Sequence, residues 1–170
     1  MMDYRQINAN SAIQFEEQKL LSLLPDSNLE ATQKAKMIGD AFKKITEMNK
    51  HILEERLIDF AAQIILFSND IEKSYAGNHL ASQIIRSSTS PALNYGEAQS
   101  AESQRDFIHK MGICLKELRE TFNCLKIIEK AILTKDVQTI TQLKTEANEL
   151  ISIFVSSLKT AKSNSEIKNR

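Results

Sequence analysis

The stretch DFIHKMGICLKELRETFNCLKII, residues 106–128, decides the fold class. Its apolar residues recur at intervals of three and four, which places them on one side of an α-helix. They are Phe107, Ile108, Met111, Cys114, Leu115, Leu118, Phe122, Leu125 and Ile128. The pattern therefore predicts an amphipathic helix that buries one stripe, with a start near Ala101 to Ser103.

Two further helices are predicted upstream of this stretch. Residues 47–74 are apolar on most of the helix circumference, so this helix should be buried by more than one neighbour, and Gly77 should break it. Residues 78–99 form the next helix. Inside it, Pro91 cannot donate a backbone hydrogen bond and should bend or loosen the turn before it. The hydroxyls of residues 87–90 can bond to the carbonyls left free there.

A fourth helix is predicted downstream, from Val137 to about Lys159, with Thr134 or Asp136 as its N-cap. The polar residues 163–170 should form a fraying tail. No alternating strand pattern competes with these helices. The sequence therefore predicts an all-α protein with an antiparallel up-and-down four-helix bundle over residues 47–162.

An N-terminal helical arm, residues 1–46, is expected to precede the bundle. It contains a possible short helix over residues 11–24, and then a heptad-like seam that continues into the first bundle helix. The seam residues are Ala31, Ala35, Ile38, Phe42 and Ile45. Such a narrow seam needs a partner helix, so we expect the arm to contact another subunit or an unidentified protein partner.

Composition excludes several classes of protein. Among 170 residues, 42% are hydrophobic and 26% charged, as in ordinary globular proteins, and the net charge of zero removes the usual electrostatic reason for non-specific nucleic-acid binding. Cys114 and Cys124 are ten positions apart on one helix, about 15 Å, too far for a disulfide. We therefore expect reduced thiols and a cytoplasmic location, without a secretory signal or a membrane span.

The segment QIIRSSTSPALNYGEAQSAESQRDFIHKMGICLKELRETFNCLKII, residues 83–128, closely resembles the bacterial 23S ribosomal RNA intervening-sequence proteins. The resemblance covers roughly Lys50 to Lys162 and leaves out the arm. The residues that carry it are Gln83, Arg86, Ser87, Ser90, Asn94, Tyr95, Glu97, Ala98, Ser103, Asp106, Phe107, Ile108, Lys116, Glu117, Glu120 and Thr121.

This resemblance implies a four-helix bundle that assembles into a ring-like homo-oligomer, typically a pentamer. Some relatives are encoded inside insertions in ribosomal RNA genes. A structurally similar bundle assists retroelement reverse transcriptases and binds nucleic acid through a basic surface. No enzymatic activity is established for the family, so the resemblance implies no catalytic residue and no cofactor.

Two kinds of chemical site are suggested by single residues but lack the partners that their chemistry needs. Asp106 and His109 have helical spacing, with Glu102 one turn earlier, but a metal-binding bundle needs two such motifs and further carboxylates. Asp106 instead suits the first turn of a helix, where negative charge is favoured. The serine–threonine cluster over residues 87–90 lacks a base and an oxyanion hole, so packing beside Pro91 is the preferred interpretation over a nucleophile.

A structural polar network is the remaining candidate site. Its predicted members lie on the second and third bundle helices and are Arg86, Ser90, Asn94, Glu97, Glu117 and Glu120. Arg86 is expected to pair with Glu117 or Glu120. We favour a network that fixes helix register or subunit contacts over a pocket for a small polar ligand.

The sequence thus favours a non-catalytic homo-oligomeric scaffold or interaction protein. The alternative is an accessory protein that binds RNA or a ribonucleoprotein through cations of the third bundle helix. These cations are Lys110, Lys116, Arg119, Lys126 and Lys130. Glu117, Glu120 and Glu129 are interleaved with them and argue against the alternative.

Overall fold

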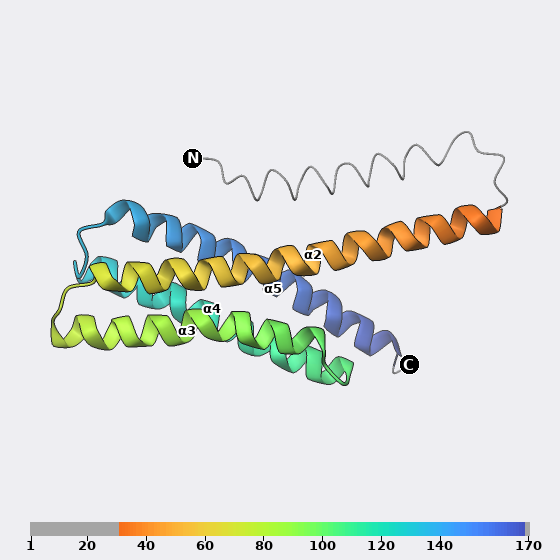
Figure 1. Ribbon diagram of the computed structural model, residues 1–170. Coiled ribbons are helices and arrows are strands. Elements are labelled where there is room, and N and C mark those ends of the chain that lie inside the picture. The colour runs from red at the N-terminus through yellow and green to blue at the C-terminus, as the bar shows by residue number, and fades with distance from the viewer. Residues whose placement is uncertain (1–30, 169–170) are drawn as a thin grey trace. The chain divides into compact units, whose positions relative to one another are not determined.

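A computed structural model describes residues 31–168 of the chain. The chain divides after Glu55 into two units, which are treated separately. The helices are α2 (Ala31–Phe67), the short 3-10 helix η1 (Ser68–Asp70), α3 (Tyr75–Gln99), α4 (Gln104–Lys130) and α5 (Val137–Lys168) (Figure 1). The described residues contain no strand, which confirms the all-α class.

The core of the second unit is a layer of large apolar side chains from all four helices. In Figure 1, α3, α4 and α5 follow one another in alternating directions, and α4 packs against both α3 and α5. The largest fully buried side chains are Leu57, Phe60, Ile64, Phe67, Ile84, Leu118, Leu125, Ile128, Ile140, Leu143, Leu150 and Phe154. Tyr95 of α3 meets Phe154 of α5 edge to face, with ring centroids 5.9 Å apart. The predicted four-helix bundle is confirmed.

The connection between α2 and α3 differs from the sequence prediction. Helix α2 ends at Phe67 rather than near Ser74, and Ile71 is extended and buried. Gly77 does not break a helix: it lies in the first turn of α3, where its N–H donates to the side chain of the N-cap residue Ser74 at 3.1 Å. A Cβ atom at Gly77 would lie 1.9 Å from the carbonyl oxygen of Glu72. The glycine is needed for this close approach, not for a helix stop.

The starts of α4 and α5 agree with the sequence. Ser103 caps α4, and its side chain accepts a hydrogen bond from the Asp106 N–H at 3.1 Å. Asp136 accepts from the Thr139 N–H at 2.9 Å, as an N-cap does. The far end of α5 does not agree, because the helix continues to Lys168 instead of ending near Lys159.

Helix α3 is continuous through Pro91. Two hydroxyls before the proline bond to the backbone of α3: Ser88 and Thr89 both donate to the carbonyl of Ile85, at 3.1 and 2.9 Å. The carbonyl whose helical partner Pro91 removes is that of Ser87, two positions after Ile85, so these bonds go to a different carbonyl from the one that the sequence predicted. The Cys114 thiol of α4 donates to the carbonyl of Pro91 at 3.5 Å. Side chains thus support the helix around the proline.

The structure describes only part of the predicted N-terminal arm. The possible helix over residues 11–24 lies outside the described residues, as do the side chains of the seam. Helix α2 itself begins at Ala31 and continues without a break into the bundle, which confirms a helical extension. The boundaries predicted after residues 46 and 162 stay predictions. Within the described helices, none combines the length and the apolar character that a membrane span requires.

Candidate functional site

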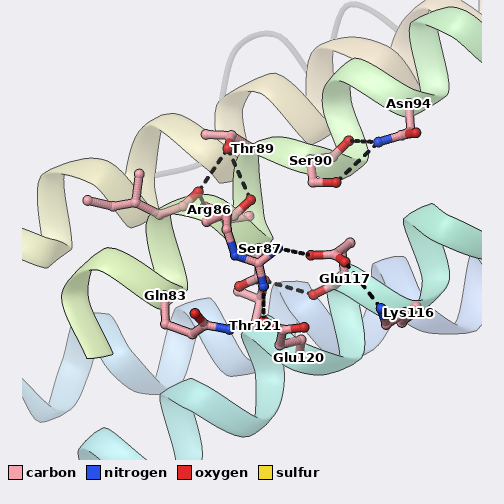
Figure 2. Close-up of polar contacts among 12 residues, drawn as sticks. Gln83, Arg86, Ser87, Thr89, Ser90, Asn94, Lys116, Glu117, Glu120 and Thr121 are labelled. Carbon is pink, nitrogen blue, oxygen red and sulfur yellow. Dashed lines mark hydrogen bonds and ion pairs between the residues drawn. The ribbon is translucent and has the colours of Figure 1, made fainter. Parts of the chain in front are cut away.

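Arg86 is the centre of the polar site between α3 and α4. Its Nη2 lies 2.5 Å from Oε1 of Glu120, and its Nη1 lies 3.6 Å from Oε2 of Glu117 (Figure 2). The side-chain amide of Gln83 also donates to Oε1 of Glu120. The expected pairing of Arg86 with α4 carboxylates is therefore present, and Gln83 joins it.

The two carboxylates have different environments. The Glu120 side chain is 25% exposed, whereas that of Glu117 is only 8% exposed beside an Arg86 that is 57% exposed. Oε2 of Glu117 is buried, and no donor in the described part of the chain makes a hydrogen bond to it. Lys116 lies 4.0 Å from the other oxygen, Oε1. Since burying a charge without compensation is costly, Arg86 is the group that makes Glu117 tolerable at this position.

A buried hydroxyl pair lies next to this ion pair. The hydroxyl oxygens of Ser87 and Thr121 are 2.9 Å apart, and both residues are completely buried. Thr121 also lies 3.0 Å from the backbone carbonyl of Glu117. A slip of α3 along α4 would separate these oxygens inside the core, so the pair fixes the register of the two helices. Ser87 was predicted as a packing residue and Thr121 only through the family resemblance.

The other predicted members form separate pairs along α3. The Asn94 side chain donates to the carbonyl and the hydroxyl of Ser90, at 2.9 and 3.1 Å (Figure 2). Glu97 accepts from Lys110 of α4 at 2.8 Å. The six predicted residues therefore make three neighbouring groups instead of one connected network. The role of these residues in subunit contacts stays a prediction.

A second clamp, which sequence reasoning missed, joins α2 to α5. Arg56 donates from Nε and Nη2 to the two carboxylate oxygens of Glu146, at 2.6 and 2.8 Å, and also bonds Glu149. These hydrogen bonds raise the pKa of Arg56. The planar guanidinium suits this two-point contact with a carboxylate. The only sequence signal was an arginine next to an apolar stripe, and its partners come ninety positions later.

Asp106 and the serines before Pro91 have structural roles in the described residues. Asp106 lies in the first turn of α4, as expected. Within residues 31–168, no three histidine, cysteine or acidic side chains are arranged to hold a metal ion. Ser87 and Ser88 are buried and donate to the carbonyls of Ile84 and Ile85. Their hydroxyls are thus used in supporting α3.

Burial should make the Cys114 thiol unreactive in the native state. Desolvation raises its pKa from 9.0 to about 12, and burial also raises the pKa of Cys124. Native protein at pH 8 should therefore resist alkylation by iodoacetamide and react only as fast as it unfolds, as mass spectrometry would measure.

The same shift has a consequence for stability. Between pH 9 and 12 the unfolded thiol ionises while the folded one stays protonated, so stability should fall as the pH rises through this range. Cys114→Ala should flatten that part of the profile. Fast alkylation of the native protein at pH 8 would contradict this account of Cys114.

Comparison with known proteins agrees with the fold and with the motif at this site. Residues 49–156, which include α3, α4 and the Arg86 site, match the family described as 23S rRNA-intervening sequence protein. The chain belongs to this family. No curated protein matches it significantly.

One solved relative of this chain has a similar fold. It is a protein with unknown function from the S23 ribosomal protein family of Bacteroides thetaiotaomicron, with a crystal structure at 1.70 Å resolution. The identity is 28% and the TM-score 0.56, over 63% of this chain and 98% of the relative. The shared region has the size of the bundle without an N-terminal extension.

Proposed function

We propose that this chain is a non-catalytic, homo-oligomeric scaffold of the cytoplasm. The observation that carries the proposal is an apolar surface on α2, made of Ile58, Ile65 and Leu66. Their exposed fractions are 47%, 43% and 68%. Ile58 and Ile65 are seven positions apart and Leu66 adjoins them, so the three share one side of the helix. Exposed apolar side chains gathered on one element are typical of an interaction surface.

A second copy of the chain is the occupant that we propose for this surface. The opposite side of α2 already fills the core with Leu57, Phe60 and Ile64, so the outward apolar side chains have no role in the bundle itself. The family resemblance points to a ring-like assembly, with five as the expected number of subunits. The extension that includes residues 31–46 is proposed to contact a neighbouring subunit or another protein.

The test is the mass of the protein in solution. Light scattering of the full chain should give an oligomer, and Leu66→Lys should shift it toward the monomer, because a buried unpaired ammonium opposes association. Leu93→Lys on α3 is the matched control, since Leu93 is equally exposed at 69% but lies on a different helix. A monomeric wild-type chain would exclude the scaffold proposal, and equal effects of both variants would move the interface away from α2.

An RNA-binding accessory role is the second candidate, and one feature of α4 favours it. Lys116, Arg119, Lys126 and Lys130 recur along one side of the helix and are exposed. The glutamates interleaved with them are engaged elsewhere: Glu120 with Arg86, and Glu129 with Lys144 at 2.5 Å. The acidic residues thus neutralise this row of cations less than their sequence positions suggest.

Salt dependence separates the two candidates. If four cations contact single-stranded RNA, affinity should fall roughly 50-fold between 50 and 200 mM salt. Fluorescence anisotropy with a labelled RNA measures this, and Arg119→Gln should reduce the slope. If the wild-type protein forms an oligomer but shows no salt-dependent RNA binding, the RNA-binding role is excluded and the scaffold proposal remains.

A further inference from the structure

The connection between α4 and α5 contains a strained, exposed isoleucine. Ile132 has a φ of 54° and is 79% exposed. It closes α4 in a Schellman motif: its N–H donates to the Glu129 carbonyl at 3.1 Å, and the N–H of Leu133 donates to the Ile128 carbonyl at 3.0 Å. Glycine is the usual residue at this position, because a left-handed conformation is unfavourable for a β-branched side chain.

Packing of the Ile132 side chain does little to offset this strain, since 79% of the residue is exposed. Leu133, the next residue, is buried and satisfies the hydrophobic contact that accompanies such a helix end. Its carbonyl accepts from the N–H of Glu72 at 2.7 Å, so the two connections at this end of the bundle are tied together. Ile132 thus lies in a corner whose two loops are joined by a backbone hydrogen bond.

The corner also contains a surface cavity. Its volume is about 410 Å³, and it is lined by Asp70, Glu72, Ile132, Leu133, Thr134, Lys135 and Asp136. Val137, the first residue of α5, adds another apolar side chain at the same end with 65% of its surface exposed. A concave site with an apolar wall and a few polar groups is the usual form of a binding pocket.

Charge decides which occupant this cavity fits. The lining holds three carboxylates, of Asp70, Glu72 and Asp136, against the single ammonium of Lys135. The Asp136 carboxylate is fixed by its bond to the Thr139 N–H at 2.9 Å. The cavity therefore fits a segment that carries an apolar side chain between basic residues. The apolar side chain would contact Ile132 and Leu133, and the lysine or arginine side chains would contact the carboxylates.

We propose that this cavity, the Ile132 pocket, is a docking site for a partner protein segment in which an aliphatic side chain is flanked by basic residues. The proposal goes beyond self-assembly, because the pocket lies in the loops and uses none of the apolar residues of the α2 surface. Isoleucine at this position is strained where glycine would not be, and this strain is then the cost of presenting an apolar side chain to the partner.

The test uses the full chain and a labelled peptide, Lys-Arg-Leu-Arg-Lys, with anisotropy as the measurement. The peptide should bind, whereas a peptide with serine in place of leucine and one with glutamates in place of the cations should bind at least tenfold more weakly. Chemical shifts in NMR should change at residues 132–135. Failure of the first peptide to bind, or equal binding of all three, would overturn the proposal.

Substitution at Ile132 gives a second readout in the opposite direction. Ile132→Gly and Ile132→Asn both suit the left-handed conformation, so neither should lower Tm, and each should weaken binding of the first peptide at least fivefold. Leu93→Asn is the control at an exposed site on α3 and should leave peptide binding unchanged. Unchanged binding by both Ile132 variants would overturn the proposal, because the Ile132 side chain would then have no part in the pocket.

Discussion

Gly77→Ala should lower the free energy of unfolding by about 3 kcal/mol. The new Cβ would lie 1.9 Å from the carbonyl oxygen of Glu72, which belongs to the backbone and cannot rotate away. This carbonyl accepts from the Ser74 N–H at 2.9 Å, and the Glu72 N–H bonds the Leu133 carbonyl at 2.7 Å. Relief of the clash would therefore disturb the bonds that connect the two loops.

Gly112→Ala is the matched control for this experiment. Gly112 lies inside α4, and a Cβ atom there would meet nothing within 4 Å. Alanine at such a position should raise stability by about 0.5–1 kcal/mol, because it restricts the unfolded chain. Urea denaturation of both variants measures the difference. Equal stability of the two variants would show that residue 77 tolerates a side chain, and it would contradict the close approach of Gly77 to the carbonyl of Glu72.

Arg86→Met should cost about 2–3 kcal/mol of stability. Removing one partner of a buried ion pair costs about 3–5 kcal/mol, and the smaller figure here follows from the exposure of Arg86 to solvent. The cost arises because Glu117, with an 8% exposed side chain, keeps a buried charge without its main compensating cation. Denaturation at pH 7 measures the loss.

The double variant Arg86→Met/Glu117→Met shows whether the cost comes from the stranded carboxylate. It should recover most of the lost stability, since both charges are gone. Lys110→Met is the control, because Lys110 bridges the same two helices to an exposed Glu97, and its loss should cost clearly less stability than the loss of Arg86. If the loss of stability in the double variant equals the sum of the losses in Arg86→Met and Glu117→Met, the effect of Arg86→Met comes from packing of the arginine side chain.

The sequence predicted the parts of the fold that depend on local patterns. The apolar residues of α4 recur so regularly, and Ser103 is so strong a cap, that the start of this helix agrees with the structure. Arg86 was expected to reach α4 because both partners lie in the segment that resembles the family. The hydroxyls of Ser88 and Thr89 bond to the backbone of α3 before Pro91, although at Ile85 and not at the carbonyl that the proline leaves free.

The remaining features depend on contacts that a local pattern does not contain. Gly77 was interpreted as a helix stop because glycine often follows a helix, yet its role is set by the backbone of Glu72. Helix α5 continues to Lys168 through polar residues, and their polar composition led to the prediction of a frayed tail there. Arg56 pairs across the bundle, and the left-handed conformation of Ile132 contradicts its residue type.

The edge contact between Tyr95 and Phe154 has a consequence for biosynthesis. Each helix leaves the ribosome in chain order, so α3 and α4 are available to pair while α5 is still being made. Their connection is short, and closing it has a small entropic cost, so this hairpin should form quickly. Until Phe154 arrives, Tyr95 and the buried face of α4 remain open to solvent and to chaperones. Of the four bundle helices, the one synthesised after the others thus closes the core.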